Sequence, residues 1–466
     1  MRYVSTRGQA PTLNFSQALL AGLAEDGGLY IPQTWPQLSA DEFRQLRGLS
    51  YPELAAKIIG LFTGNDIPQP VLLDLCQQSY AGFNHKAIVP LIQLEHNLFV
   101  QELFHGPTLA FKDMAMQLLG RLFDYVLSQK GQRINIVGAT SGDTGSAAIE
   151  AFKDSKYLTV TILHPYGRTS EVQRRQMTTV LSSNINNIAV EGSFDDCQDL
   201  VKAMFADASF RDEVQLSAVN SINWGRIAAQ VPYYIYAALA LGAPDREVSF
   251  TVPTGNFGNI LAAWTAKKMG LPINVLCVAS NHNDILTRFI LNNDMSIQGV
   301  KPSLSPSMDI QISSNFERLL FELLNRDANQ CRQIMQDFRK NGKMDIPDLL
   351  WNKAKESFKG LALSDEETKT VIQNCYNDSL YLADPHTAIG IATAQKYRSK
   401  DVPMITVATA HPAKFPDALK QATGILPPLP LALADLYDRK ENYQILPADL
   451  QKIENSVRAV ILKNNF

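Results

Sequence analysis

The chain has 466 residues, 45% of them hydrophobic and 19% charged, and 43 basic against 46 acidic residues leave a formal net charge of −3. This length and composition predict a folded globular protein of two or three domains. The mixed charges form no one-sided basic stripe, which argues against nucleic-acid binding, and no apolar run approaches the ~18 residues of a membrane span. The N-terminus lacks the apolar core of a secretory signal, so we expect a cytoplasmic location.

The first 95 residues are expected to be mostly helical. Apolar spacing predicts an amphipathic helix and a short strand within residues 15–32, and two helices within 39–62, the first capped by Ser39. Residues 86–104 are typical of two short strands. They lead into "HGPTLAFKD" (105–113), where a loop enters a helix. An apolar stripe at helical spacing follows in that helix: Phe111, Met114, Ala115, Leu118, Leu119, Leu122 and Val126.

From about residue 130, strands and helices alternate strictly. Short β-branched runs at 133–140, 157–165, 184–192 and 214–221 are separated by helical stretches, and a second such series begins at 247 and resumes at 403–410. This alternation predicts an α/β fold with parallel sheets covered on both faces. We expect an N-terminal segment (1–95), a larger α/β domain (96–130 and 236–466) and a smaller α/β domain (131–235). Residues 280–400 are less regular, and a proline-marked connection at 425–437 precedes a terminal helix.

Three loops follow predicted strands, where open α/β sheets bind ligands. In "GATSGDTGSAA" (138–148), residues 141–145 open a helix whose N–H groups suit a carboxylate or phosphate; an ordinary capped turn is the alternative. The loop "TGNFGN" (254–259) lacks the lysine of a Walker A sequence and the full GxGxxG spacing, which favours a single phosphate group. In "TVATAHPAKF" (406–415) a strand ends at Thr409, whose hydroxyl is placed to meet a ligand or is simply at home in a strand.

Lys112 lies in the first turn of a helix, where basic residues are disfavoured. Beside an apolar stripe and a positive helix end, its pKa would be lowered, as a Schiff-base lysine needs; a surface lysine is the alternative. Together with a phosphate-type loop, a carboxylate-type loop and a strand-end threonine, it fits pyridoxal phosphate. His105 and His411 are expected to be structural. The five scattered cysteines have no CxxC spacing, and no metal site is indicated.

The motifs "HGPTLAFKD", "GATSGDTG", "VPTGNFGN" and "TAHPAKF", in this order, closely resemble those of the threonine synthase family of the bacterial and fungal type. The similarity spans Tyr3 to about Phe415. It implies a fold-type II pyridoxal phosphate enzyme (tryptophan synthase β-like) and a carbon–oxygen lyase of threonine biosynthesis. Such an enzyme converts O-phospho-L-homoserine and water to L-threonine and phosphate by β,γ-elimination and replacement. The alternative is a related phospholyase or a serine/threonine dehydratase that releases a keto acid.

The resemblance also implies the roles of individual residues. Lys112 would form the Schiff base with the cofactor, and Thr409 would hydrogen-bond to its pyridine nitrogen. The residues that would hold the cofactor phosphate are Gly255, Asn256, Phe257 and Asn259. The loop that would receive the substrate carboxylate contains Ser141, Asp143 and Thr144, although many fold-type II relatives have Asn in place of Asp143. The basic candidates for the substrate phosphate are Arg7, Arg226 and Lys414. The family resemblance favours a monomer.

Overall fold

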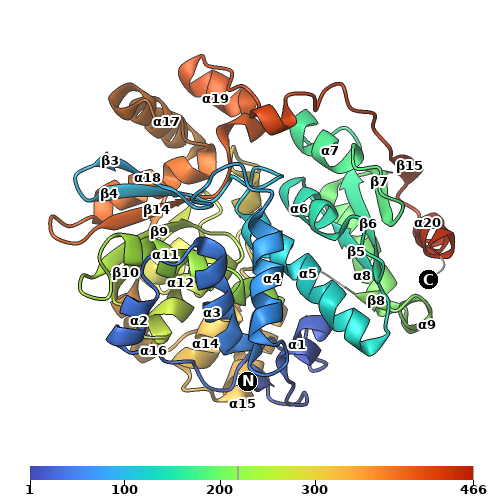
Figure 1. The fold of residues 1–466 in the computed structure, drawn as a ribbon, viewed down its shortest axis with the longest axis horizontal. Helices are drawn as coiled ribbons and strands as arrows, with labels where there is room; N and C mark the ends of the chain where they lie inside the picture. The colour runs from blue at the N-terminus through green and yellow to red at the C-terminus, as the bar shows by residue number, and fades with distance from the viewer. Residues whose placement is uncertain (218–219, 465–466) are drawn as a thin grey trace.

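The computed structural model describes residues 1–217 and 220–464 and contains two sheets of mostly parallel strands, one in each half of the molecule (Figure 1). The larger sheet has the order β13 (Phe358–Ala362), β10 (Ile273–Ser280), β9 (Val248–Pro253), β14 (Met404–Ala408), β4 (Leu98–Glu102) and β3 (Leu91–Glu95). Only the pairing of β3 with β4 is antiparallel within it. The smaller, all-parallel sheet has the order β15 (Gln444–Pro447), β7 (Ile185–Glu191), β6 (Leu158–Pro165), β5 (Ile134–Ala139) and β8 (Leu216–Ser217). The predicted α/β class is confirmed.

Helices cover both sheets. Strands β6 and β9 are buried along their whole length, as expected for parallel strands between two helical layers. Around the larger sheet lie α12 (Gly258–Lys268), α13 (Ile285–Asn292), α14 (Phe316–Leu323), α15 (Ala328–Asn341), α16 (Asp348–Ser357), α17 (Asp365–Ser379), α18 (Pro385–Tyr397) and α19 (Pro416–Thr423). Around the smaller sheet lie α6 (Asp143–Phe152), α7 (Glu171–Thr178), α8 (Phe194–Ala206), α9 (Ala208–Glu213) and α20 (Leu450–Lys463).

Most of the regular structure in the N-terminal segment is helical, as predicted, although helices take up less than half of residues 1–95. It contains β1 (Tyr3–Ser5), α1 (Phe15–Ala21), β2 (Tyr30–Pro32), α2 (Ala40–Gln45), α3 (Tyr51–Thr63) and α4 (Gln69–Tyr80). Ser39 caps α2, because its side chain accepts a hydrogen bond from the backbone N–H of Glu42. Helix α1 packs against α10 (Trp224–Ala228), and α3 packs against α11 (Val231–Ala240), while α4 packs against α3 and α5 (Lys112–Lys130).

Helix α5 (Lys112–Lys130) lies between the two halves and contacts α4, α6 and α10. Six residues of its predicted apolar stripe, from Met114 to Val126, are buried, whereas Phe111 is only half-buried. A helix buried on both sides holds its first residue, Lys112, at the junction of the two sheets.

The last two elements differ from the predicted domain division. Strand β15 pairs in parallel with β7, and α20 packs on β6 and β7, so residues 444–463 belong to the smaller sheet and not to the larger domain. The cause is non-local, since the chain crosses from one half to the other after α19. The rest of the predicted division stays a prediction.

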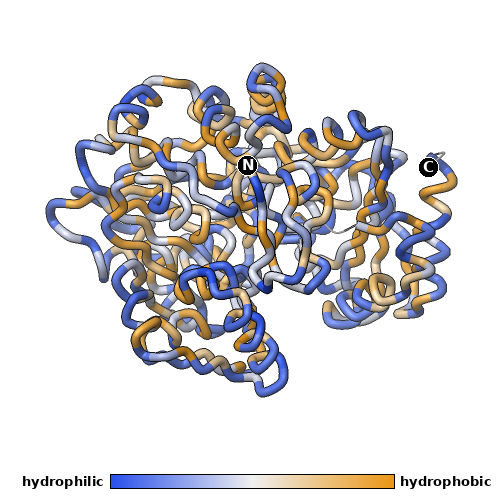
Figure 2. The backbone as a smooth tube through the Cα atoms, turned by 90° about the horizontal axis from the view of Figure 1, so that it is seen from below, coloured by the Kyte–Doolittle hydropathy of each residue, from blue (hydrophilic) through white to orange (hydrophobic). Residues whose placement is uncertain are grey.

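Two other regions also differ from expectation. The strand predicted at 214–221 is seen only as β8, and residues 218–219 lie outside the described residues. Residues 280–400 are largely helical, and they also contain β13 and a short antiparallel pair formed by β11 (Met295–Ser296) and β12 (Lys343–Met344). In Figure 2 hydrophobic segments run through the interior of both halves, and hydrophilic segments lie at the outer turns. Within residues 1–217 and 220–464, no helix combines the length and apolarity needed to span a bilayer.

Candidate active site

A cavity of about 1180 Å³ lies where the carboxyl ends of strands from both sheets meet. Strands β5, β9 and β14 end there, and the loops that follow them line the cavity. Open α/β sheets bind ligands at this kind of edge. The structure brings together in this cavity all the site residues singled out in the sequence: Lys112, Ser141, Asp143, Thr144, Gly255, Asn256, Phe257, Asn259 and Thr409.

Lys112 is the first residue of α5 and is buried, with 7% of its surface exposed. Its Nζ lies 3.5 Å from Oδ2 of Asp143 and 5.1 Å from the centre of the Phe111 ring. Burial lowers the pKa of Lys112, and the nearby cations of Arg226 and Lys414 lower it further, whereas Asp143 opposes the shift. The predicted direction of the shift is confirmed, and the neutral amine is accessible at a lower pH than in a solvated lysine.

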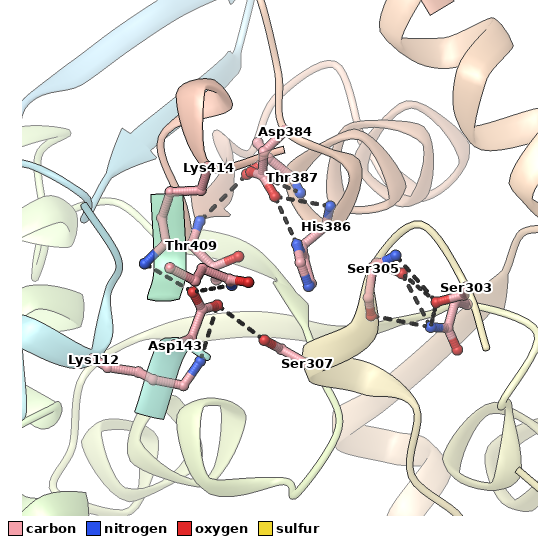
Figure 3. A network of polar contacts seen from close by, with 12 residues as sticks. Lys112, Asp143, Ser303, Ser305, Ser307, Asp384, His386, Thr387, Thr409 and Lys414 are labelled. Atoms are coloured by element: carbon pink, nitrogen blue, oxygen red, sulfur yellow. Dashed lines mark hydrogen bonds and ion pairs between the residues drawn. The ribbon is translucent and has the colours of Figure 1, made fainter. Parts of the chain in front are cut away.

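Asp143, the first residue of α6, is the centre of a buried polar network (Figure 3). Its Oδ1 accepts hydrogen bonds from Lys414 Nζ at 2.8 Å and Gln173 Nε2 at 2.8 Å, and its Oδ2 accepts one from Ser307 Oγ at 3.0 Å. Burial alone would raise the pKa of Asp143, but Lys414 and Lys112 outweigh it and hold the pKa well below its ordinary value. The carboxylate is therefore ionised.

The loop between β9 and α12 is shaped by two backbone features. Phe257 adopts φ +62°, a left-handed conformation that is uncommon for an aromatic residue, directly before α12 begins at Gly258. At Gly255 a Cβ atom would come within 2.9 Å of the carbonyl oxygen of Ser307, so the close approach of the two loops requires glycine. The result is a concave backbone segment at the N-terminus of a helix, the kind of site that binds phosphate.

Asn259 adds a directed donor to this segment. The hydroxyls of Tyr233 and Tyr234 both donate to its Oδ1, the latter at 2.6 Å, which fixes the orientation of the amide. Its Nδ2 is buried and has no partner among the described residues. A buried N–H group without a partner is costly unless a ligand accepts from it. The segment from Gly255 to Asn259 therefore fits the phosphate group of pyridoxal phosphate.

Thr409 follows β14 and is held at the cavity by its backbone. Its N–H donates to Oγ1 of Thr387 at 3.3 Å, and its carbonyl oxygen accepts from the N–H of Phe111 at 2.8 Å. These contacts join the end of β14 to the start of α18 and to the residue before Lys112. The hydroxyl of Thr409 is thus placed on the same cavity as the Lys112 amine, as the resemblance implies for a pyridine partner.

His386 also lines the cavity, and sequence reasoning missed it. Its Nδ1 lies 2.7 Å from Oδ1 of Asp384, the residue that caps α18, while its Nε2 is buried without a partner among the described residues. Ser307 and Gln173 were missed as well. Asp384 followed by Pro385 is a typical helix start, a signal that could have located α18 and with it His386. Ser307 and Gln173 carry no such sequence signal, because only the tertiary fold brings them into contact with Asp143.

The three basic candidates for the substrate phosphate are in different environments. Arg226 lines the cavity with 5% of its surface exposed, and its Nη1 has no partner among the described residues. Arg7 instead pairs with Glu317, with Nη2 and Oε2 2.9 Å apart, and it faces another pocket. Lys414 is fully buried and directed at Asp143 and the carbonyl oxygen of Thr108, so it is not one of the residues that line the cavity. Of the three candidates, Arg226 therefore lines the cavity, whereas Arg7 and Lys414 are each held by other groups.

The two histidines of the sequence motifs lie outside the cavity lining. His105 Nε2 is 2.8 Å from Oε2 of Glu102, and His411 Nδ1 accepts from the N–H of Ala413 at 3.1 Å. Burial lowers the pKa of His411 to about 4. These contacts are consistent with the predicted structural role, which stays a prediction for both histidines.

The fold and the cavity define a pyridoxal-phosphate-dependent enzyme. The family model described as "Pyridoxal-phosphate dependent enzyme" matches residues 87–412. Models described as "Threonine synthase N terminus" and "Threonine synthase, C-terminal" match residues 2–80 and 387–457.

Full-length relatives narrow this class further. The chain is 53% identical to a threonine synthase of Pseudomonas aeruginosa, over 97% of each chain. It is similar to the crystal structure of a PLP-bound threonine synthase from Brucella melitensis, with TM-score 0.97, 53% identity and 99% of each chain covered. The yeast threonine synthase structure has TM-score 0.94, 40% identity and 99% of each chain covered. The chain belongs to the threonine synthase family, and its activity is that of a pyridoxal-phosphate-dependent threonine synthase.

Proposed function

We propose that the cavity converts O-phospho-L-homoserine and water to L-threonine and phosphate, with Lys112 as the residue that holds the cofactor and moves the protons. The observation that carries this proposal is the buried Lys112 amine, whose pKa is lowered and which faces the three ligand-type loops in one cavity. When bound, pyridoxal phosphate supplies the electron sink for a carbanion on the substrate. A neutral amine at Lys112 can take a proton from one carbon and return it to another.

Cofactor contacts are assigned to the remaining loops in the same proposal. The segment from Gly255 through Asn256 and Phe257 to Asn259 holds the cofactor phosphate, supported by the unpartnered Asn259 Nδ2 at a helix N-terminus. The hydroxyl of Thr409 forms a hydrogen bond with the pyridine nitrogen of the cofactor. Because a hydroxyl carries no charge, it leaves that nitrogen largely unprotonated.

Substrate contacts are assigned by charge. Ser141 and Thr144 bind the substrate carboxylate at the N-terminus of α6, where the helix dipole favours an anion. Asp143 is itself an anion, so we assign it to Lys112 and the cofactor side of the loop and not to the substrate carboxylate. Arg226 binds the substrate phosphate, because it lines the cavity and its buried Nη1 has no partner among the described residues.

A product assay tests this function. The purified holoenzyme is incubated with O-phospho-L-homoserine, and L-threonine, phosphate and keto acids are measured. We expect threonine and phosphate in equal amounts. A keto acid such as 2-oxobutyrate as the main product would favour the phospholyase or dehydratase alternative and overturn the proposal.

We also propose that the chain acts as a monomer in the cytoplasm. The family resemblance supports the first point, and five cysteines, all buried as free thiols, are at home in a reducing compartment. Sedimentation equilibrium of the holoenzyme tests the oligomeric state, and cell fractionation tests the location. A dimer mass or a secreted pool would contradict them.

A further inference from the structure

Lys414 is a lysine whose charge is completely removed from water. It ends the short 3-10 helix Pro412–Lys414 after β14, and none of its surface is exposed. Its Nζ donates to Oδ1 of Asp143 at 2.8 Å and to the carbonyl oxygen of Thr108 at 2.7 Å. An ammonium group is rarely buried in this way unless it is paired.

The two oxygens of Asp143 serve different lysines. Lys414 donates a charge-assisted hydrogen bond to Oδ1 at 2.8 Å. The Nζ of Lys112 lies 3.5 Å from Oδ2, which is longer than a strong hydrogen bond. Ser307 donates to Oδ2 at 3.0 Å and supplies a second partner on the Lys112 side. The carboxylate is thus held mainly by Lys414 and only loosely by Lys112.

The same lysine is connected to the loop before Lys112. The carbonyl oxygen that it contacts belongs to Thr108, whose N–H and hydroxyl donate to Asp113 at 2.7 and 2.6 Å. Asp113 follows Lys112 directly in α5. Lys414 therefore touches both the carboxylate beside the reactive amine and the loop that leads to it, without lining the cavity itself.

We propose that Lys414 is a positioning residue for the reaction: it holds Asp143 ionised and away from Lys112, so that the Lys112 amine loses its proton readily. If Asp143 had no other cation, it would pair with Lys112 alone and favour the charged amine. If residue 143 were neutral, Lys414 would be a buried charge without a partner. The aspartate at 143 and the lysine at 414 therefore function as a unit. This inference rests on the role proposed for Lys112.

The charge relations predict the sign of each substitution. Lys414 is one of the groups that lower the pKa of Lys112, and Asp143 is the group that raises it. Lys414→Met should therefore raise the pKa of Lys112. Each pH unit by which the pKa of Lys112 rises leaves about tenfold less neutral amine at neutral pH.

The test compares pH profiles of holoenzyme variants: Lys414→Met, Asp143→Asn, the double variant, and Lys153→Met as control. Lys153 also pairs with a carboxylate on α6, Glu150, at 2.6 Å, but at the exposed end of the helix. The measurements are kcat and KM from pH 6 to 10, and the absorbance of the bound cofactor over the same range. We expect Lys414→Met to move the acidic limb of kcat and the absorbance titration up by at least one pH unit. At neutral pH, kcat should fall about tenfold with little change in KM.

The double variant keeps the test decisive if a single variant folds poorly, since it removes both buried charges together. The acidic limb of its kcat profile should lie at higher pH than that of Asp143→Asn, because the Lys414 cation is absent from the double variant. Coincident limbs in these two variants, or a Lys414→Met profile equal to that of Lys153→Met, would overturn the inference. Threonine production by the unsubstituted enzyme is measured in parallel, so that a failure of the proposed function is recognised separately.

Discussion

Replacing Arg226 by Met should make the protein more stable and less active. The guanidinium is buried, and burial lowers the pKa of Arg226 from its ordinary value to about 10. At about 1.4 kcal/mol per pH unit, holding this charge costs the folded protein roughly 3 kcal/mol. Because the folded-state pKa lies below the unfolded one, this cost is fully present below about pH 10 and falls away gradually as the pH rises from there to the ordinary pKa of arginine.

The same charge is the source of substrate affinity in our proposal. A charge-assisted hydrogen bond to a phosphate in a buried site contributes about 2–3 kcal/mol, which corresponds to roughly 30- to 150-fold in kcat/KM. We therefore expect Arg226→Met to lower kcat/KM by this factor, mainly through KM. The melting temperature of the holoenzyme without substrate should rise.

The assay pairs thermal unfolding with steady-state kinetics and with inhibition by inorganic phosphate, whose inhibition constant should rise in parallel with KM. Arg7→Met is the matched control. Arg7 forms its ion pair with Glu317 outside the cavity, so this variant should lose stability and keep its KM. An unchanged KM and an unchanged phosphate inhibition constant in Arg226→Met would refute the assignment.

Three further substitutions test the cofactor side of the cavity. Lys112→Ala should abolish turnover and borohydride-dependent attachment of the cofactor, with the far-UV circular dichroism unchanged; residual turnover would remove Lys112 from the mechanism. Asn259→Leu should weaken pyridoxal phosphate binding about tenfold in an absorbance titration, because a charge-assisted hydrogen bond is lost; an unchanged dissociation constant would place the phosphate elsewhere. Thr409→Asp should protonate the pyridine nitrogen and change the cofactor spectrum, and an identical spectrum would mean that another group meets this nitrogen.

Much of the secondary structure was predictable because its signals are local. Ser39 followed three residues later by Glu42 is a capping box, and the structure has α2 starting there. The β-branched runs at 157–165 and 184–192 appear as β6 and β7. By contrast, β15 joins the smaller sheet through pairing with β7, more than 250 residues away in the sequence. Its own four residues contain nothing that selects this partner over an edge of the other sheet.

The sequence by itself located four features of the cavity: a lysine at a helix start, a loop opening α6, a glycine-bearing loop before α12 and a threonine at the end of β14, each following from residue types within one short motif. Only the tertiary structure decided which charges meet. It placed Lys414 on Asp143, paired Arg7 with Glu317 and directed Arg226 into the cavity. The physical reason is that a charged side chain is paired or left free according to distances of a few ångströms through space and to its burial. Neither quantity is encoded in the neighbouring residues.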